Sequence, residues 1–210
     1  MTPERDPALK GAPGAADIVE SPRHEPRLPP GQVLTDKWPV LHYGTVPAVD
    51  LASWDLRVDG LVAHPFTLSW REFQQLPRAQ VRSDIHCVTR WSRYDNLWEG
   101  VAVATLLDRA QPKPEARFAV VHAEHDYTAN LPLAALRDAD VLLADRHDGE
   151  PLAPEHGWPL RLVVPDRYFW KSAKWVRRIE LVADDHPGFW ERNGYHNDAD
   201  PWREERFSDW

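Results

Sequence analysis

The chain has 210 residues, a formal net charge of -8 and a sequence pI of about 5.7. This length is enough for one domain with a substantial core. The acidic balance argues against nucleic acid as the main partner, because phosphate binding needs a basic face. No apolar run approaches the roughly 20 residues that cross a bilayer, so no membrane span is predicted.

The chain begins with a segment, residues 1–32, that is rich in Pro, Gly, Ala and charge and has little apolar periodicity. This composition predicts a flexible or surface-wrapping tail. The first residues contain neither the apolar core of a signal peptide nor a twin-arginine leader, so we expect a cytoplasmic protein. A lone reduced thiol is consistent with that location. The folded domain is expected over residues 33–210.

Short strands and short helices are expected in that domain. Helical segments are predicted at 67–76, where Ser69 or Thr67 is the cap, at 103–110 and as a single turn at 130–138. Strands are predicted at 56–62, 81–85, 117–124, 141–144, 160–165 and 176–182. Twenty prolines favour short elements and many loops, which indicates a β-rich α+β fold.

The chain contains eleven tryptophans, which are many for its length. Most of them lie in apolar-patterned segments, which indicates core packing. A cofactor cleft walled by aromatic rings is the alternative. The last 25 or so residues are rich in Trp, Asp, Arg and Asn, and we expect them to wrap back over the core.

Cys87 is the only cysteine in the chain. It cannot form an internal disulfide, so it is either an inert core residue or a chemically active one. The residue type alone favours the inert reading. However, His86 precedes the thiol, and Arg90 and Arg93 follow it. Nearby positive charge and polar groups stabilise a thiolate, so the setting of Cys87 favours the chemical reading.

Five segments, in order and with consistent spacing, carry a family resemblance. They are residues 84–92 (Asp-Ile-His-Cys-Val-Thr-Arg-Trp-Ser), 97–101, 156–165, 168–176 and 188–196. Together they resemble the single-domain bacterial branch of the sulfite-oxidase-like molybdopterin oxidoreductases, from about residue 35 to the carboxy terminus. The resemblance implies a molybdopterin-binding domain of that family. It also implies an enzyme that carries Mo-molybdopterin and transfers an oxygen atom, with two electrons, to or from a small oxyanion, sulfoxide or N-oxide.

The resemblance also assigns roles to individual residues. Cys87 becomes the one protein ligand to molybdenum, since a soft thiolate suits that metal. Arg161 becomes the seat of the cofactor phosphate, because a guanidinium presents a planar fork to phosphate oxygens. An exposed strand arginine is the alternative for Arg161. His156, five residues earlier on a loop with Gly157 and Pro159, is expected to face the cofactor.

The resemblance implies further cofactor-binding residues, which lie in less specific motifs. Lys171, Ser172 and Lys174 form a second candidate phosphate seat. His42 and Tyr43 match a segment that touches the pterin, and an ordinary turn is the alternative. Thr128 resembles another cofactor-facing position.

Two departures from the family pattern bear on these assignments. Asp126 stands where relatives often have glycine, which puts the backbone near Thr128 in question. Arg90 and Arg93 are candidates to attract an anionic substrate, with Arg90 assigned to catalysis. Alternatively, Arg90 and Arg93 pair with nearby carboxylates. Their pattern differs from that of animal and plant sulfite oxidases, which weakens sulfite as the substrate.

Two other functions remain open at this point. One is a reactive-thiol enzyme in which His86 or His156 serves Cys87 as a base. The other is a non-catalytic member of the fold that binds a pterin or a protein. Metal, nucleotide and hydrolase motifs such as His-Glu-x-x-His, Gly-x-Gly-x-x-Gly and Gly-x-Ser-x-Gly do not occur. The residues after the last strand are too few for a haem or dimerisation domain, so a separate redox protein is the expected partner.

Overall fold

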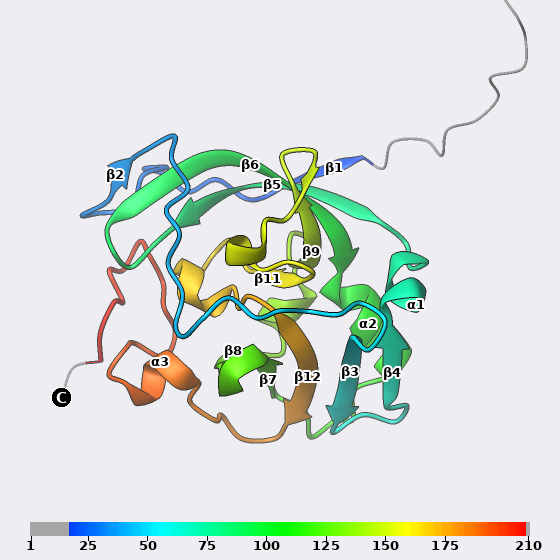
Figure 1. Ribbon diagram of the computed structural model, residues 1–210. Helices are drawn as coiled ribbons and strands as arrows, with labels where there is room; N and C mark the ends of the chain where they lie inside the picture. The colour runs from blue at the N-terminus through cyan, green and yellow to red at the C-terminus, as the bar shows by residue number, and fades with distance from the viewer. Residues whose placement is uncertain (1–16, 209–210) are drawn as a thin grey trace, which may run out of the picture.

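The computed structural model describes residues 17–208, in which the strands form two sheets. The larger sheet lies in the upper half of the view and the smaller one in the lower half (Figure 1). The larger sheet runs β1 (Ile18–Glu20), β5 (Ala79–His86), β6 (Trp91–Ala102), β9 (Leu142–His147) and β10 (Glu150–Pro151), with β2 (Val33–Leu34) on β6 and β11 (Arg161–Val163) on β9. The smaller sheet runs β4 (Phe66–Ser69), β3 (Asp55–Gly60), β12 (Val176–Val182), β7 (Phe118–Ala123) and β8 (Thr128–Pro132). The β-rich α+β fold predicted from the sequence is confirmed.

The α-helices are short. They are α1 (Trp70–Gln74), α2 (Val103–Ala110) and α3 (Phe189–Arg192), and 3-10 turns occur at η1 (Glu124–Asp126), η2 (Ala135–Arg137), η3 (Pro154–His156) and η4 (Phe169–Lys171). Ser69 caps α1 as part of a capping box with Glu72, in which each side chain accepts a hydrogen bond from the other's backbone N–H. Helix α2 has the predicted bounds, and its buried residues recur at the spacing of one helix face.

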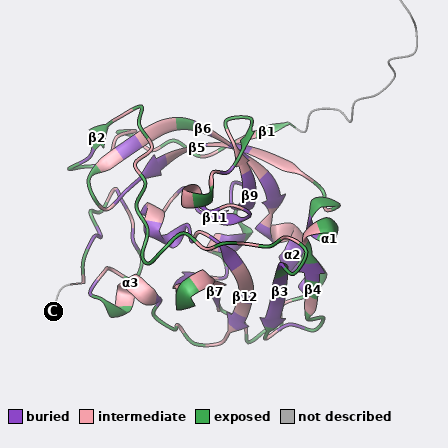
Figure 2. Ribbon diagram, in the orientation of Figure 1, coloured by how far each residue is buried: buried purple, intermediate pink, exposed green. Residues whose placement is uncertain are grey.

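The core extends over both sheets. Buried side chains of the smaller sheet, such as Leu56, Val58 and Ile179, pack with Leu106 and Leu107 of α2 in the main cluster. A second cluster lies on the larger sheet and includes Trp98 and Ile85. Figure 2 shows the buried residues concentrated in the strands and the exposed ones along the connecting segments.

The structure refines several of the predicted segments. The helix predicted at 67–76 begins only at Trp70, because Phe66–Ser69 form β4. Within residues 17–32, for which the sequence predicts a flexible or surface-wrapping tail, Ile18–Glu20 form β1, which pairs in parallel with β5 at the edge of the larger sheet. Residues 1–16 of that predicted tail lie outside the described residues. The predicted helical turn at 130–138 begins instead as strand β8, which pairs with β7, and the turn follows as η2.

The long strand β6 was not predicted. Its register shifts against β9 between Glu99 and Gly100, and this irregularity breaks the alternation on which a strand prediction depends. Gly100 is required there, because an added Cβ would clash with the backbone carbonyl of Leu143. The strand carries the chain away from the Cys87 turn, so it positions one side of the site.

Candidate active site

Cys87 lies in a tight turn between two strands of the larger sheet. It follows β5, its backbone N–H donates to the carbonyl of Trp91 (2.9 Å), and its carbonyl accepts from the N–H of Arg90 (3.0 Å). Arg90 has the left-handed φ of 75° that closes the turn. The thiol sulfur lies 3.1 Å from the Thr89 hydroxyl. Burial raises the pKa of the Cys87 thiol, against the opposing effects of the Thr89 hydrogen bond and of the positive charges on Arg206 and Lys174.

The thiol lines a cavity of about 320 Å³. The cavity is enclosed by the Cys87 turn, by residues 38–43, and by the chain that runs from β11 through η4 to α3. Its walls are the residues Trp38, Pro39, Leu41, His42, Tyr43, Cys87, Val88, Thr89, Trp91, Glu124, Tyr127, Arg161, Phe169, Trp170, Ser172, Ala173, Lys174, Trp175, Trp190 and Tyr195. Of the predicted site residues, the cavity therefore brings together His42, Tyr43, Cys87, Arg161, Ser172 and Lys174.

One end of the cavity is cationic. Arg161 is only 1% exposed, and its guanidinium donates to the backbone carbonyls of His156 (2.8 Å) and Ser172 (3.0 Å). Among the described residues, no carboxylate pairs with it. Burial lowers the pKa of Arg161, although an arginine keeps its charge near neutral pH. A buried cation whose protein partners are all neutral is a strong attractor for an anion.

Lys174 adds a second cation at that end. Its ammonium group also donates to backbone carbonyls, those of Leu41 (2.7 Å) and Glu155 (2.6 Å). Burial and the charge of Arg161 lower the pKa of Lys174 to about 7. Trp38 and Phe169 complete this end, with the Arg161 guanidinium 4.2 Å from the centre of the Phe169 ring. We call this region of the cavity the cationic end.

Another region of the cavity wall is aromatic. Trp190 stacks on Tyr195 with ring centroids 4.8 Å apart, and Trp170 meets Tyr195 edge to face at 4.9 Å. Val88, the neighbour of Cys87, packs against the same cluster. Among the described residues that line the cavity, the basic ones are His42, Arg161 and Lys174, and none of them belongs to this cluster. We call this region, Trp170 with Trp190 and Tyr195, the aromatic end.

Four predicted site residues do not line the cavity. Lys171 is buried away from it, where its ammonium group pairs with Glu191 (2.7 Å) and donates to Asn130. This pair ties η4 to α3, so Lys171 has a structural role. Thr128 lies on β8 with its hydroxyl buried and unpaired among the described residues.

His156 and Arg90 are the other two predicted site residues that do not line the cavity. His156 lies behind Trp38 and stacks on it, with ring centroids 3.8 Å apart and planes 6° from parallel. Burial lowers the pKa of His156 to about 4, so it is neutral at physiological pH. Arg90 is exposed on the Cys87 turn, and no described carboxylate pairs with it. Arg93, its neighbour in the motif, pairs instead with Asp148 (2.7 Å).

The sequence offers a cleft walled by aromatic rings only as an alternative to core packing, and it gives no indication of the residues behind the Cys87 turn. The segment 188–196 carries part of the family resemblance, but no periodicity indicates that Trp190 and Tyr195 line the cavity. Gln32 and Arg206 were also missed, although both donate to carbonyls of the Cys87 turn. They come from the two ends of the chain, and no local pattern connects them.

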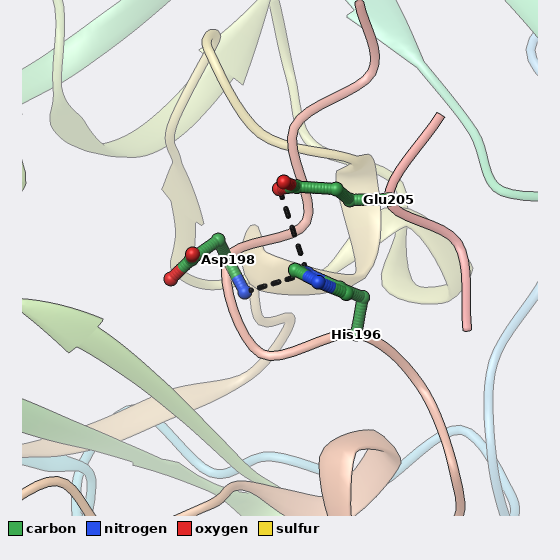
Figure 3. A group of neighbouring side chains, drawn as sticks. All are labelled: His196, Asp198 and Glu205. Atoms are coloured by element: carbon green, nitrogen blue, oxygen red, sulfur yellow. Dashed lines mark hydrogen bonds and ion pairs between the residues drawn. The ribbon is translucent and has the colours of Figure 1, made fainter. Parts of the chain in front are cut away.

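A second group of side chains has the composition of a metal site. His196, Asp198 and Glu205 have potential ligand atoms within 4.8 Å of one another. However, Figure 3 shows that Asp198 meets the His196 ring through its backbone N–H (3.1 Å), while its carboxylate points away. Glu205 pairs with both His196 (3.5 Å) and Arg203 (3.0 Å). These contacts give the three side chains a structural role, in which they stabilise the carboxy-terminal segment.

Comparison with known proteins agrees with this geometry. Residues 43–190 match the family described as the oxidoreductase molybdopterin binding domain. Over 183 residues the chain is 51% identical to YuiH, an uncharacterized oxidoreductase of Bacillus subtilis, and the match covers 87% of this chain and 92% of YuiH.

More distant relatives are named for different substrates. The catalytic subunit MsrP of a protein-methionine-sulfoxide reductase, from Gluconobacter oxydans, is 31% identical over 66% of this chain and 50% of its own length. The sulfite oxidase of Arabidopsis thaliana is 29% identical over 73% of this chain and 48% of its own length. The chain thus spans about half of these two proteins. The crystal structure of the sulfane dehydrogenase SoxCD from Paracoccus pantotrophus shares the fold, with a TM-score of 0.64 at 24% identity over 69% of this chain and 42% of that one.

Proposed function

The chain belongs to the oxidoreductase molybdopterin binding family, and we propose that it uses the cavity at Cys87 to transfer an oxygen atom to or from a small molecule. As a member of this family it is an oxidoreductase whose cofactor is Mo-molybdopterin. The observation that carries the proposal is the position of the thiol, which opens into a cavity with a buried cationic end.

The residues at the cavity fit this cofactor. Arg161 is a buried cation that donates only to neutral carbonyls among the described residues, so an anionic phosphate would neutralise it. Lys174 would support the same phosphate. Cys87 would be the protein ligand to molybdenum, and the rings of Trp38 and Phe169 offer flat apolar surfaces for a pterin.

When bound, the cofactor supplies two-electron chemistry coupled to the movement of one oxygen atom. The protein holds, orients and shields it. Cys87 would hold the metal, Arg161 and Lys174 would hold an anionic phosphate, and the aromatic walls would exclude water from the reacting centre. In the reducing direction a sulfoxide, two electrons and two protons become a thioether and water.

The aromatic end supports a finer proposal about the substrate. An oxyanion such as sulfite or nitrate needs cationic donors, and the three residues of the aromatic end supply none. Trp190 and Tyr195 instead offer aromatic faces, which suit the sulfur and methyl groups of an uncharged molecule. We therefore propose an uncharged oxygen donor of the sulfoxide class.

The geometry disfavours the reactive-thiol alternative. The hydrogen-bonding partner of the Cys87 sulfur is the Thr89 hydroxyl, which is no base. His86 faces away, because its Nδ1 atom is paired with the Ser92 hydroxyl (2.9 Å), and burial lowers its pKa to about 4. A raised thiol pKa further opposes nucleophilic chemistry at neutral pH.

The electrons require a partner, and we propose a separate one-electron redox protein. No helix of residues 17–208 is long and apolar enough to cross a membrane. We propose the cytoplasm as the location, on the basis of the lone thiol and the composition of the chain.

Elemental analysis tests the function directly. Wild type and Cys87→Ser are purified from a host that makes molybdopterin, and molybdenum and pterin are measured per chain. We expect about one molybdenum per chain in the wild type and a loss of at least about tenfold in the variant, because a first ligand is removed. A wild type without molybdenum or pterin would refute the proposed function.

A further inference from the structure

Two segments that flank the family-matched residues 43–190 converge on the Cys87 turn. We call residues 17–35 the amino-terminal arm and residues 196–208 the carboxy-terminal arm. Both belong to the part of the chain that the structure describes. Figure 1 shows β2, at the end of the first arm, and the red carboxy-terminal segment on the same side of the molecule.

Each arm donates to a backbone carbonyl of the turn. Gln32 of the amino-terminal arm donates from its side-chain amide to the carbonyl of Cys87 itself (3.0 Å). Arg206 of the carboxy-terminal arm donates from Nη1 to the carbonyl of Val88 (2.8 Å). Both side chains are buried, 8% and 5% exposed. Buried hydrogen bonds are costly to lose, because the carbonyl is left unpaired away from water.

The arms are also joined to each other. Arg206 donates from Nη2 to the carbonyl of Pro30 (3.3 Å), and the Trp202 indole donates to the carbonyl of Pro26 (3.0 Å). The Trp202 ring stacks on His24 with centroids 3.6 Å apart. Arg206 thus bridges the two arms and the turn at once.

Close packing of the arms constrains the sequence at one further position. Gly31 has a φ of 67°, and a Cβ there would lie 2.6 Å from a carboxylate oxygen of Glu204. The positive φ favours glycine at this position, and a larger residue would also require the Glu204 side chain to move. The backbone of the amino-terminal arm continues into β2, where the N–H of Val33 donates to the carbonyl of Arg90 (2.9 Å). The turn is therefore held at three of its carbonyls, those of Cys87, Val88 and Arg90.

We propose that the two arms form a clasp that sets the position of the Cys87 sulfur, with Gln32 and Arg206 as positioning residues. The inference rests on the proposed role of Cys87 as metal ligand. A metal site depends on the groups that hold its ligands, since their removal typically weakens metal binding about 10- to 100-fold. In this protein, Gln32 and Arg206 act through the backbone of the turn. Cys87 lines the cavity, while its carbonyl accepts the hydrogen bond from Gln32.

The test compares Arg206→Met with Arg203→Met in the holoenzyme. Arg203 is a matched control, because it lies on the same arm, is exposed, and pairs only with Glu205 among the described residues. Three quantities are measured: the rate at which molybdenum is lost during dialysis, the visible absorption from thiolate-to-metal charge transfer, and the thermal midpoint. Arg206→Lys tests rescue, because a lysine restores one donor.

We expect Arg206→Met to lose molybdenum about tenfold faster than wild type and to shift the absorption band, with Arg203→Met unchanged and Arg206→Lys intermediate. A lower thermal midpoint with unchanged metal loss and spectrum would overturn the proposal, because it would show a purely structural role. An equal effect of Arg203→Met would overturn it too.

Gln32→Leu is the second variant, should Arg206→Met fail to fold. It removes only the donor to the Cys87 carbonyl and leaves the bridge between the arms. We expect the same spectral shift and metal loss about tenfold faster than in wild type, the low end of the range for outer groups. An unaltered Gln32→Leu spectrum would overturn the proposal. A wild type that carries no molybdenum is a different outcome. It would refute the proposed function itself, on which the clasp depends.

Discussion

The two ends of the cavity are both walled by aromatic rings, and they differ in charge. The cationic end has Arg161 and Lys174, whose donors are directed at neutral carbonyls. The aromatic end has Trp170, Trp190 and Tyr195, which pack on one another. The wall of one cavity therefore combines a cationic region that attracts an anion with an apolar contact surface, and Cys87 lines the same cavity.

The ends also differ in how they are built. Arg161 lies on β11, a strand of the larger sheet, and is fully surrounded by the core. Trp190 lies on the short helix α3 near the end of the chain, and is only partly buried. A rigid end suits a cofactor that stays bound, and a more exposed end suits a substrate that enters and leaves.

The largest expected effect is at the cationic end. Arg161→Leu would remove the buried charge that we assign to the cofactor phosphate. Loss of a partner from a buried charged pair costs about 3–5 kcal/mol, so we expect cofactor affinity to fall by two orders of magnitude or more. Pterin and molybdenum per chain measure this. The exposed Arg117 is the control, and equal retention in Arg161→Leu and Arg117→Leu would contradict the assignment.

The aromatic end should respond differently. Trp190→Ala would remove a stacking surface and leave the cationic end intact, so we expect normal molybdenum content. The kcat/KM for a sulfoxide, with reduced methyl viologen as the electron donor, should fall about tenfold, the effect of about 1.4 kcal/mol of aromatic contact. Trp190→Phe should retain most of the activity. If sulfite or nitrate proves a better substrate than any sulfoxide, the proposed substrate class is wrong and the oxygen-transfer function stands.

The cationic end was the more predictable of the two from sequence. Arg161 and Cys87 lie in short motifs, and helix α2 and strand β12 have the predicted bounds because their apolar spacing is regular. In the segment Lys171-Ser-Ala-Lys174, however, the sequence does not show which lysine faces the cavity. Lys171 pairs with Glu191, whereas Lys174, three residues further along an irregular turn, lines the cavity.

The clasp and the aromatic end could not be predicted in the same way. Gln32 and Cys87 are separated by 55 residues and meet only through tertiary packing. The composition of residues 17–32 indicates a flexible or surface-wrapping tail, and it does not show that part of the segment forms a strand at a sheet edge, which proline does not prevent. Local sequence patterns indicate periodicity and turns, but they do not indicate which distant parts of the chain make contact.

The smallest expected effect concerns pH. The pKa of Lys174 is lowered to about 7 in the folded protein, so the side chain gains its charge as the pH falls through 7. The cationic end of the cofactor-free protein should therefore bind an anion more tightly at pH 6 than at pH 8. One added charge near a partly buried site contributes about 1 kcal/mol, or roughly fivefold.

Sulfate is the suitable probe, since it keeps its double charge over this range, and calorimetry gives its affinity. His42 also lines the cavity, so the contribution of Lys174 is isolated by Lys174→Met, in which most of the pH dependence should disappear. Lys113→Met, at an exposed position, should keep it. A pH dependence that survives in Lys174→Met would place the titrating group elsewhere and would leave Arg161 as the cation that defines this end.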